Sequence, residues 1–305
     1  MSTKEKDYTR QINIVQDYIG ANLDKPLTVQ ELAKLLNFSV YHFHRIFTQY
    51  VGESLAKYVL RRRLEMAAMC LKCDPTVAIV NVAYEVGFNS ANVFCRNFKK
   101  HFGITAEEYR SKNSQTDSKN STLKRNHNPS DRVYSHYFCS SKTLIIGDKT
   151  MECTFEIKQL PALRVVYCRH NGAYDQMQNA FAKLMQWSYP RGLVTPEAKL
   201  LSIYYDNPDV TVSDRLISDA CLQVKEPVKV DGEIGYYELQ GGQYAVGRFE
   251  IAMEEFKDAW NSMFKLIAEH GCQCIGLPFE IYQNNRAEHP EKKFIVDICI
   301  PVKPL

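Results

Sequence analysis

The chain has 305 residues, of which 45% are hydrophobic and 24% are charged, and its formal net charge is +3 at pH 7. This length and apolar content exclude a disordered chain and allow two or three separate cores. No apolar run reaches the roughly 18 residues that a membrane-spanning helix needs, and the N-terminus lacks signal-peptide character. We therefore expect a cytoplasmic protein with no membrane partner.

Charge is distributed unevenly along the chain. Residues 1–112 carry 16 Lys and Arg against 11 Asp and Glu, whereas residues 151–305 carry 16 against 21. The basic half suits a polyanion, because phosphate contacts dominate nucleic-acid affinity. The acidic half suits neutral or cationic ligands.

Ten cysteines raise the question of a metal site. Cys70 and Cys73 have a zinc-like spacing, and Cys272 and Cys274 lie far along the chain, but no further His or Cys pair completes a tetrahedral site. Buried thiols in a reducing compartment are the favoured interpretation. We expect no metal and no cofactor.

Residues 1–25 predict an amphipathic helix that ends before Asp24. Its apolar face consists of Ile12, Val15, Ile19 and Leu23, which recur at helical spacing. We expect this face to pack beneath the helices that follow.

Residues 28–52 predict two short helices joined by a turn. Thr28 and Glu31 form a capping box, so the first helix begins one residue after Thr28. Asn37 tolerates the left-handed conformation that ends a helix, and Ser39 is a good cap for the next one. Gly52 ends the second helix.

The second of these helices has an apolar and a polar side. Phe43, Ile46, Phe47 and Tyr50 recur at helical spacing and should face the core. The polar side offers Tyr41, His44, Arg45 and Thr48.

The helix-turn-helix pattern of residues 28–52 recurs further along the chain. Arg45 and Gly52 recur as Arg96 and Gly103, both at an offset of 51. The polar side of a helix can simply be a solvated surface. A polar side that carries Arg, His, Asn and Lys also suits insertion into the major groove of DNA. Duplication at matching positions favours the second interpretation. The outward residues of the second copy are Ser90, Asn92, Cys95, Arg96 and Lys99.

Residues 53–71, between the copies, predict one long helix of about 28 Å. Such a rod can hold two reading helices roughly 34 Å apart, which is one turn of DNA. One chain could then read two successive major grooves without dimerising.

Residues 28–110 closely resemble the DNA-binding domain of the AraC/XylS family, down to GFNSANVFCRNFKKHFG followed by EEYR. The resemblance implies a sequence-specific transcriptional regulator, with double-stranded promoter DNA and RNA polymerase as partners. It places six residues on base-facing positions: Tyr41, His44, Arg45, Asn92, Cys95 and Arg96.

Residues 111–131 are polar and cannot bury enough surface to fold, so they predict a linker. Residues 133–150 could form a short hairpin. The expected domains are therefore an all-α domain with two helix-turn-helix motifs at 1–112, a linker at 113–150 and a second domain at 151–305.

The second domain contains a strand, helix, strand, strand order twice. Asp219 matches Asp297 and Cys221 matches Cys299, at an offset of 78. This duplication predicts an α+β domain, with an antiparallel sheet, two helices on one face and a cleft along the pseudo-twofold axis. Glu280, between Phe279 and Ile281 in a predicted strand, either points into water or faces the cleft as a counter-charge for a cation.

This half resembles the GyrI-like effector-binding domain over most of residues 153–303, in LPALRVVYCRHNGAYDQM, IYYDNPD, PFEIY and DICIPV. The resemblance implies that Glu280 lies in a central pocket that binds a small-molecule effector, for which a lipophilic cation is a candidate. The two resemblances together give a Rob-like arrangement. The expected ligand-binding residues are Tyr167, Tyr174, Trp187, Tyr204, Tyr205, Glu280 and Tyr282. The aromatic ones are selected because they lie in the repeated elements, although roughly half of them could simply be core residues.

Two other functions compete with an effector-binding regulator. Some GyrI-like domains hydrolyse reactive small molecules, but this chain shows no nucleophile with a paired base, so we expect no enzyme activity. The acidic second domain could also be a protein-interaction module.

Overall fold

The computed structural model describes residues 3–73, 76–115, 140–146 and 149–304. The chain divides into two compact units. Unit 1 comprises residues 1–71, 76–106 and 162–240, and unit 2 comprises residues 72–75, 107–161 and 241–305. Unit 1 therefore combines most of the N-terminal helices with part of the predicted second domain.

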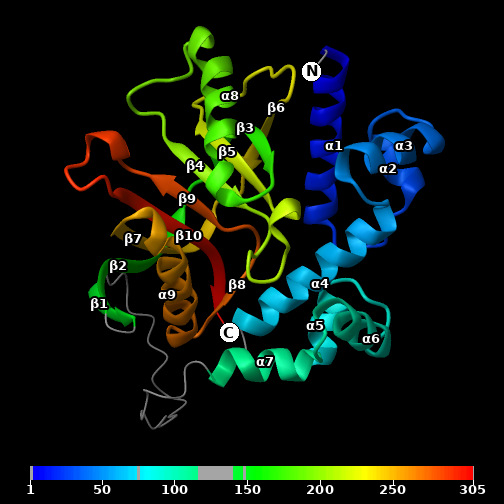
Figure 1. Cartoon of the computed structure of the whole chain (residues 1–305), viewed down its shortest axis with the longest axis horizontal. Coiled ribbons are helices and arrows are strands. Elements are labelled where there is room, and N and C mark those ends of the chain that lie inside the picture. The colour runs from blue at the N-terminus through cyan, green and yellow to red at the C-terminus, as the bar shows by residue number, and fades with distance from the viewer. Residues whose placement is uncertain (1–2, 74–75, 116–139, 147–148, 305) are drawn as a thin grey trace. The chain divides into compact units, whose positions relative to one another are not determined.

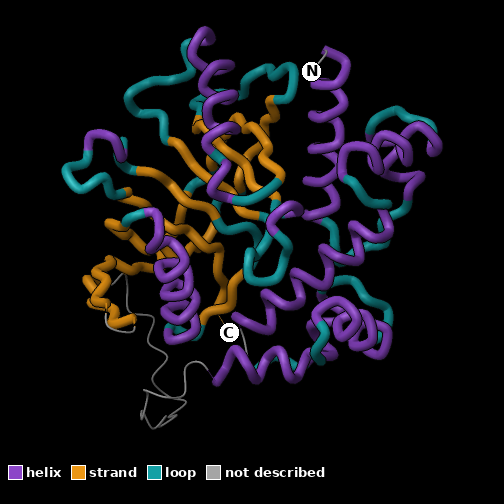
Figure 2. The backbone as a smooth tube through the Cα atoms, viewed as in Figure 1, coloured by secondary structure: helices purple, strands orange, loops and turns teal. Residues whose placement is uncertain are grey.

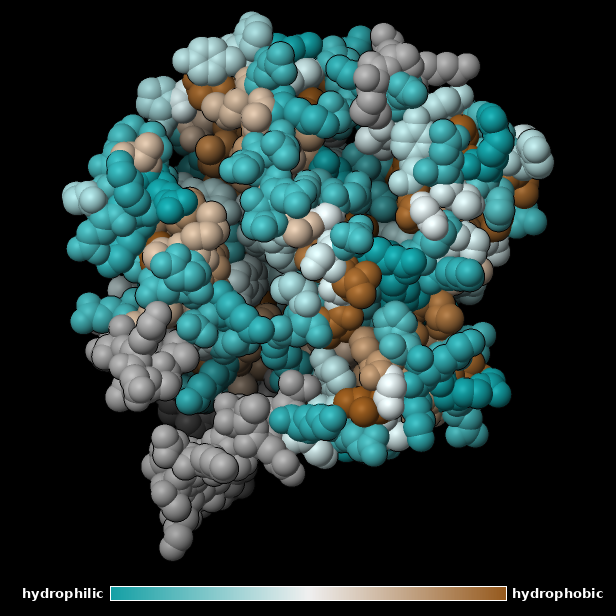
Figure 3. Space-filling view, viewed as in Figure 1, coloured by the Kyte–Doolittle hydropathy of each residue, from teal (hydrophilic) through white to brown (hydrophobic). Residues whose placement is uncertain are grey.

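The chain is helical through its first part (Figures 1 and 2). No described helix has the length and apolar content to cross a membrane. On the side shown in Figure 3, apolar residues gather in small groups among hydrophilic ones. The helices are α1 (Thr3–Ala21), α2 (Val29–Leu35), α3 (Val40–Val51), α4 (Leu55–Cys73), α5 (Ile79–Glu85), α6 (Ala91–Phe102) and α7 (Ala106–Gln115).

The predicted helix boundaries are confirmed by their capping contacts. The Thr28 side chain accepts from the Glu31 amide, and the Glu31 carboxylate accepts from the Thr28 amide, both at 3.2 Å. Asn37 takes a left-handed φ of 53° after α2. Ser39 caps α3 by accepting from the His42 amide. Gly52 ends α3 at φ 79°.

The predicted apolar face of α1 is also confirmed. Ile12, Val15 and Ile19 of α1 are at most 3% exposed, and they share one core with Phe43 of α3 and with Leu23, which lies in the turn after α1 because the helix ends at Ala21. In the second helix pair, Phe94 and Phe98 of α6 are fully buried. Each helix-turn-helix thus has an aromatic back that fixes the direction of its polar side.

Four strands of the second domain belong to unit 1. They form an antiparallel sheet in the order β4-β5-β3-β6. Helix α8 (Gln178–Ser188) covers one face, where it packs on Val166, Ala220 and Leu222. The strands are β3 (Leu163–Asn171), β4 (Leu200–Tyr204), β5 (Ile217–Gln223) and β6 (Ile234–Leu239).

Unit 2 holds a second antiparallel sheet in the order β1-β2-β7-β10-β9, with β8 also paired to β10. Helix α9 (Phe256–Glu269) packs on it through Met263, Leu266 and Ile267. The strands are β1 (Ser140–Ile146), β2 (Lys149–Leu160), β7 (Gly242–Ile251), β8 (Cys272–Cys274), β9 (Phe279–Tyr282) and β10 (Phe294–Pro304).

The predicted duplication is present, and the two copies exchange their first strands. Strand β2, from the first copy, pairs with β7 of the second copy, whereas β6, from the second copy, pairs with β3 of the first. The β1–β2 hairpin occupies part of the region where a hairpin was expected. Residues 111–115 of the predicted linker continue α7, and residues 116–131 lie outside the described residues.

Candidate functional sites

Helix α3 presents its predicted polar side to solvent. Tyr41 is 80% exposed, and His44 and Arg45 are exposed beside it. Phe43 and Phe47 hold the opposite side in the core at 0% exposure. The exposed side is therefore carried on a helix that is capped at both ends and packed along its back.

Helix α6 repeats this arrangement in the second helix-turn-helix. Asn92, Arg96 and Lys99 are exposed, while Phe94 and Phe98 are buried. Both helices thus present an arginine at the same relative position, on a surface open to a partner.

Three other predicted DNA contacts are less accessible. Ser90, Cys95 and Thr48 are each only partly exposed. The Thr48 hydroxyl oxygen is buried, and among the described residues it has no hydrogen-bond partner. Ser90 occupies the N-cap position of α6 without a side-chain capping bond.

Part of the N-terminal basic excess is unavailable to DNA. Arg61 of α4 is buried and pairs with Glu53 at 2.8 Å and with Glu65 at 3.1 Å. Arg62 is also buried and pairs with Asp206. The exposed basic side chains, which include Arg45 on α3 and Arg96 and Lys99 on α6, remain available to phosphates.

Glu280 lies inside unit 2, because its exposed fraction is 1%. It stands opposite Ile298 in the β9–β10 register, on the side of the sheet that α9 covers. Trp260 of α9 donates its indole N–H to Oε1 at 2.7 Å, and Tyr282 donates its hydroxyl to Oε2 at 2.7 Å. A buried carboxylate among aromatic groups attracts a cation, because the cation compensates the buried charge and the ring faces attract it.

Trp260 was absent from the predicted ligand set. It lies on the helix of the second copy rather than on a strand that resembles the family motif. The sequence did contain one indication that Trp260 belongs to the site. The chain has only two tryptophans, and each lies on one of the two repeated helices.

The predicted aromatic residues of the first copy divide between two faces of the sheet. Tyr174 and Tyr204 pack in the core beneath α8, where their ring centroids lie 4.9 Å apart, and Trp187 is a partly buried residue of α8 itself that packs against the same core. Tyr167 and Tyr205 lie on the other face and hydrogen-bond to groups outside that core.

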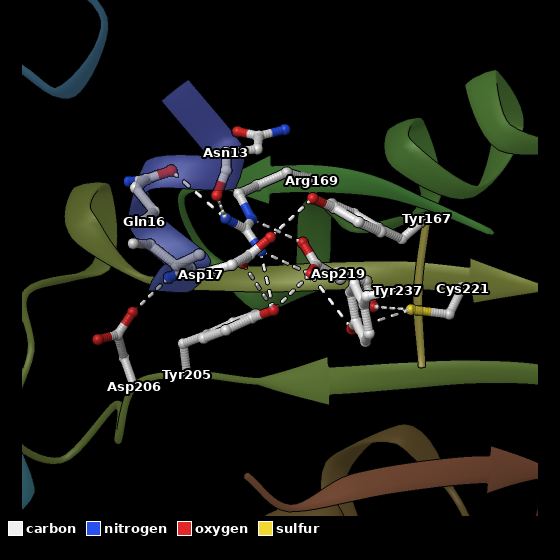
Figure 4. Close-up of polar contacts among 11 residues, drawn as sticks. Asn13, Gln16, Asp17, Tyr167, Arg169, Tyr205, Asp206, Asp219, Cys221 and Tyr237 are labelled. Carbon is white, nitrogen blue, oxygen red and sulfur yellow. Dashed lines mark hydrogen bonds and ion pairs between the residues drawn. The ribbon is translucent and has the colours of Figure 1, made fainter. Parts of the chain in front are cut away.

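That other face holds a buried ionic cluster, drawn in Figure 4. Arg169 of β3 and Asp219 of β5 are register partners joined by two hydrogen bonds of 2.8 Å. The Tyr205 hydroxyl donates to Asp219 at 2.8 Å. Burial raises the pKa of Asp219, and the positive charge of Arg169 opposes this rise.

The described residues include no group of three or more His, Cys, Asp or Glu side chains that could hold a metal ion. Cys168 and Cys221 are buried in the sheet of unit 1. Burial raises the pKa of the Cys168 thiol to about 12, so this side chain stays protonated near neutral pH.

Comparison with known proteins supports the family resemblance of both the N-terminal and the C-terminal part of the chain. Residues 32–112 match the helix-turn-helix family of AraC type, and residues 154–303 match the GyrI-like small molecule binding domain. The multiple antibiotic resistance protein MarA of Escherichia coli is 31% identical over 108 residues, which cover 35% of this chain and 84% of MarA. The DNA gyrase inhibitor of Escherichia coli is 30% identical over 157 residues, which cover 49% of this chain and 97% of that protein.

A solved structure matches the N-terminal part. It is a transcriptional regulator with an AraC-type DNA-binding domain from Chromobacterium violaceum, at 30% identity and a TM-score of 0.33, and the match covers 34% of this chain and 93% of that one. The reading helices and the sequence matches define a DNA-binding transcriptional regulator. The chain belongs to the AraC-type helix-turn-helix family, with a GyrI-like small-molecule binding domain at its C-terminal end.

Proposed function

We propose that residues 1–112 read promoter DNA and that residues 151–305 bind a small-molecule effector, with residues 113–150 as the connection. The regulator works in the cytoplasm, contacts RNA polymerase at its promoter and catalyses no reaction. The observation that carries the DNA-binding half is the pair of exposed polar helix sides, one on α3 and one on α6. An exposed Arg can hold guanine through two hydrogen bonds, and Asn can do the same for adenine.

The proposed base contacts are the predicted residues on these sides, of which Arg45 and Arg96 stand at equivalent points. We expect Arg45→Ala and Arg96→Ala each to reduce discrimination at particular base pairs by about 1 to 3 kcal/mol. Lys99→Ala is the matched control on α6, because a phosphate contact should weaken binding to all sequences alike.

The measurement is binding of the full chain to a duplex library, with the sequence preference of each variant compared at one salt concentration. Loss of preference in each arginine variant should fall within one half-site. Equal weakening for every duplex would contradict the assignment of the two arginines to base edges.

For the effector-binding half, we propose that Glu280 accepts a lipophilic cation with help from Trp260 and Tyr282. The burial of the carboxylate and its two aromatic donors support this proposal. An aromatic face attracts a cation by about 0.5 to 2 kcal/mol per contact. The other proposed contacts, Tyr174, Trp187 and Tyr204, lie on the corresponding helix-covered face of the first copy.

Glu280→Gln keeps the shape of the side chain and removes its charge. We expect calorimetry on the full chain to show a clear loss of affinity for tetraphenylphosphonium, while affinity for DNA without the cation stays nearly unchanged. The variant also replaces one of the two oxygens that accept from Trp260 and Tyr282 by an amide nitrogen, so thermal unfolding of the same variant is the control for packing. Equal cation binding by the wild type and the variant would exclude Glu280 as the electrostatic partner.

A further inference from the structure

Helix α1 covers the ionic cluster on the sheet of unit 1. Asp17 of α1 accepts from Arg169 at 2.6 Å and from the Tyr167 hydroxyl at 2.9 Å (Figure 4). The Arg169 guanidinium also donates to the Asn13 carbonyl oxygen at 3.3 Å. Helix α1, which packs beneath the first helix-turn-helix, is therefore also bound to the β4-β5-β3-β6 sheet of unit 1.

The second copy of the repeat contains an Arg–Asp pair equivalent to Arg169 and Asp219 that no helix covers among the described residues. Arg248 and Asp297 are register partners and form the same paired hydrogen bonds, at 2.6 and 2.8 Å. The Arg248 side chain is 54% exposed, whereas that of Arg169 is 1% exposed. The Arg–Asp pair is thus a repeated feature of the strands, and only the first copy uses it to hold a helix among the described residues.

Helix α4 makes a second contact with the same part of unit 1. Arg62 pairs with Asp206, whose carboxylate also accepts from the Ile217 amide at 2.6 Å. The Thr211 hydroxyl donates to Glu65 of α4 at 2.8 Å. Because α4 joins the two helix-turn-helix motifs, this contact fixes the element that sets the spacing of the reading helices.

One hydrogen bond links the Arg62–Asp206 contact to the face of the sheet that α8 covers, where the proposed ligand residues Tyr174 and Tyr204 lie. Tyr174, which packs against Tyr204 beneath α8, donates its hydroxyl to the carbonyl oxygen of Asp206 at 2.6 Å. Asp206 in turn holds Arg62 of α4. A ligand that displaces the Tyr174 ring would therefore disturb Asp206, which is bound directly to α4 between the two helix-turn-helix motifs.

The contacts of Asp17, Arg169 and Arg62 are ionic, which suits a joint that opens, while Ile217 and Tyr205 add apolar packing against the core of α1 and α3. Buried ion pairs add little net stability, because desolvation offsets much of their attraction. Burial raises the pKa of Asp206, and the positive charge of Arg62 opposes this rise. When such groups separate, water can solvate each of them again, whereas an apolar interface would expose its surface.

We propose that Arg169, Tyr167, Tyr205, Asp219 and Asp206 form a dock for α1 and α4, and that the docked state is the one that binds DNA tightly. Effector occupancy is passed to the reading helices by a shift of this equilibrium. The regulatory part rests on the proposed effector-binding function. The dock itself rests on contacts among the described residues.

The test is Asp17→Asn in the full chain, with Asp7→Asn on the same helix as a matched control. Asp17→Asn removes the charge that α1 gives to the dock, while Arg169 keeps its pair with Asp219, so we expect the variant to fold. Asp7 pairs with Arg10 of its own helix, and its side chain is 48% exposed. Both variants change the net charge equally.

We expect hydrogen–deuterium exchange of residues 10–20 to be faster in Asp17→Asn than in Asp7→Asn. We also expect Asp17→Asn to weaken binding to a duplex selected by the wild type by about 5-fold or more, which is the usual lower range of coupling between sites. Faster exchange with unchanged DNA affinity would mean a purely structural contact and would overturn the proposal. Identical behaviour of the two variants would overturn it as well.

A third measurement separates the dock from the proposed ligand class. If tetraphenylphosphonium changes the DNA affinity of the wild type, that change should be smaller in Asp17→Asn. If calorimetry shows no binding of the cation to the wild type, the ligand class is wrong, but the exchange and DNA-binding results without a ligand still decide whether the dock acts as proposed.

Discussion

Phe43→Ala is expected to lower the free energy of unfolding by about 3 to 5 kcal/mol, the usual cost of removing a buried phenylalanine. The Phe43 side chain is fully buried and stacks on Phe47 with 5.6 Å between ring centroids. It belongs to the core that α1 shares with the first helix-turn-helix. Denaturant unfolding of the full chain, followed by helical circular dichroism, measures the loss.

Tyr41→Ala is the matched control, since it removes an aromatic ring two residues earlier on the same helix. Tyr41 is 80% exposed, so its loss should change stability by only about 0.5 kcal/mol or less. Its DNA binding should nevertheless fall, because the ring lies on the proposed reading side. Equal stability of the two variants would show that α3 does not depend on its buried side.

Gly87→Ala is expected to be the second severe change, at about 2 to 5 kcal/mol from backbone strain and overpacking together. Gly87 lies in the turn between α5 and α6 with φ at +87°. A Cβ there would lie 2.2 Å from the Leu23 carbonyl oxygen and 2.9 Å from the Arg63 guanidinium. Arg63 itself donates to that oxygen at 2.9 Å, so the turn is closely packed against fixed backbone.

Gly103→Ala separates the two causes. Gly103 also has a left-handed φ, of +75°, but a Cβ there would meet no atom within 4 Å. Only the conformational cost of about 1 to 2 kcal/mol should remain. Thermal unfolding of both variants measures the difference, and a loss at Gly87 no larger than at Gly103 would show that the close contact relaxes without cost.

The helices could be predicted in detail because their signals are local. The capping box at Thr28 and the left-handed Asn37 involve residues within one or two turns, and the structure confirms both. The duplication also carried information about the strands, since matching positions such as Asp219 and Asp297 lie in equivalent strands of the two copies.

The dock could not be predicted, because its partners lie far apart in the sequence. Asp17 lies on the polar side of an amphipathic helix, where a carboxylate is ordinarily a solvated residue. Arg169 lies about 150 residues later, and nothing in its strand indicates a helix partner. The strand exchange between β2 and β6 was missed for the same reason, since pairing is set by the whole sheet.

The aromatic ligand set was predicted from shared position in the repeat, without regard to strand geometry. Successive residues of a strand point to opposite faces of a sheet. Tyr204 packs beneath α8, whereas its neighbour Tyr205 bonds to Asp219 on the other face. The alternation along the strand contained this information, and it separates pocket candidates from dock residues.

The dock also affects the order in which the chain can fold during synthesis. At about 5 to 20 residues per second, α1 is made roughly 8 to 30 seconds before Arg169. The sheet that carries Arg169 is complete only when β6 ends at Leu239. An apolar docking side on α1 would be exposed throughout this interval and would favour aggregation. A side formed by Asn13, Gln16 and Asp17 remains compatible with water until its partner strands exist.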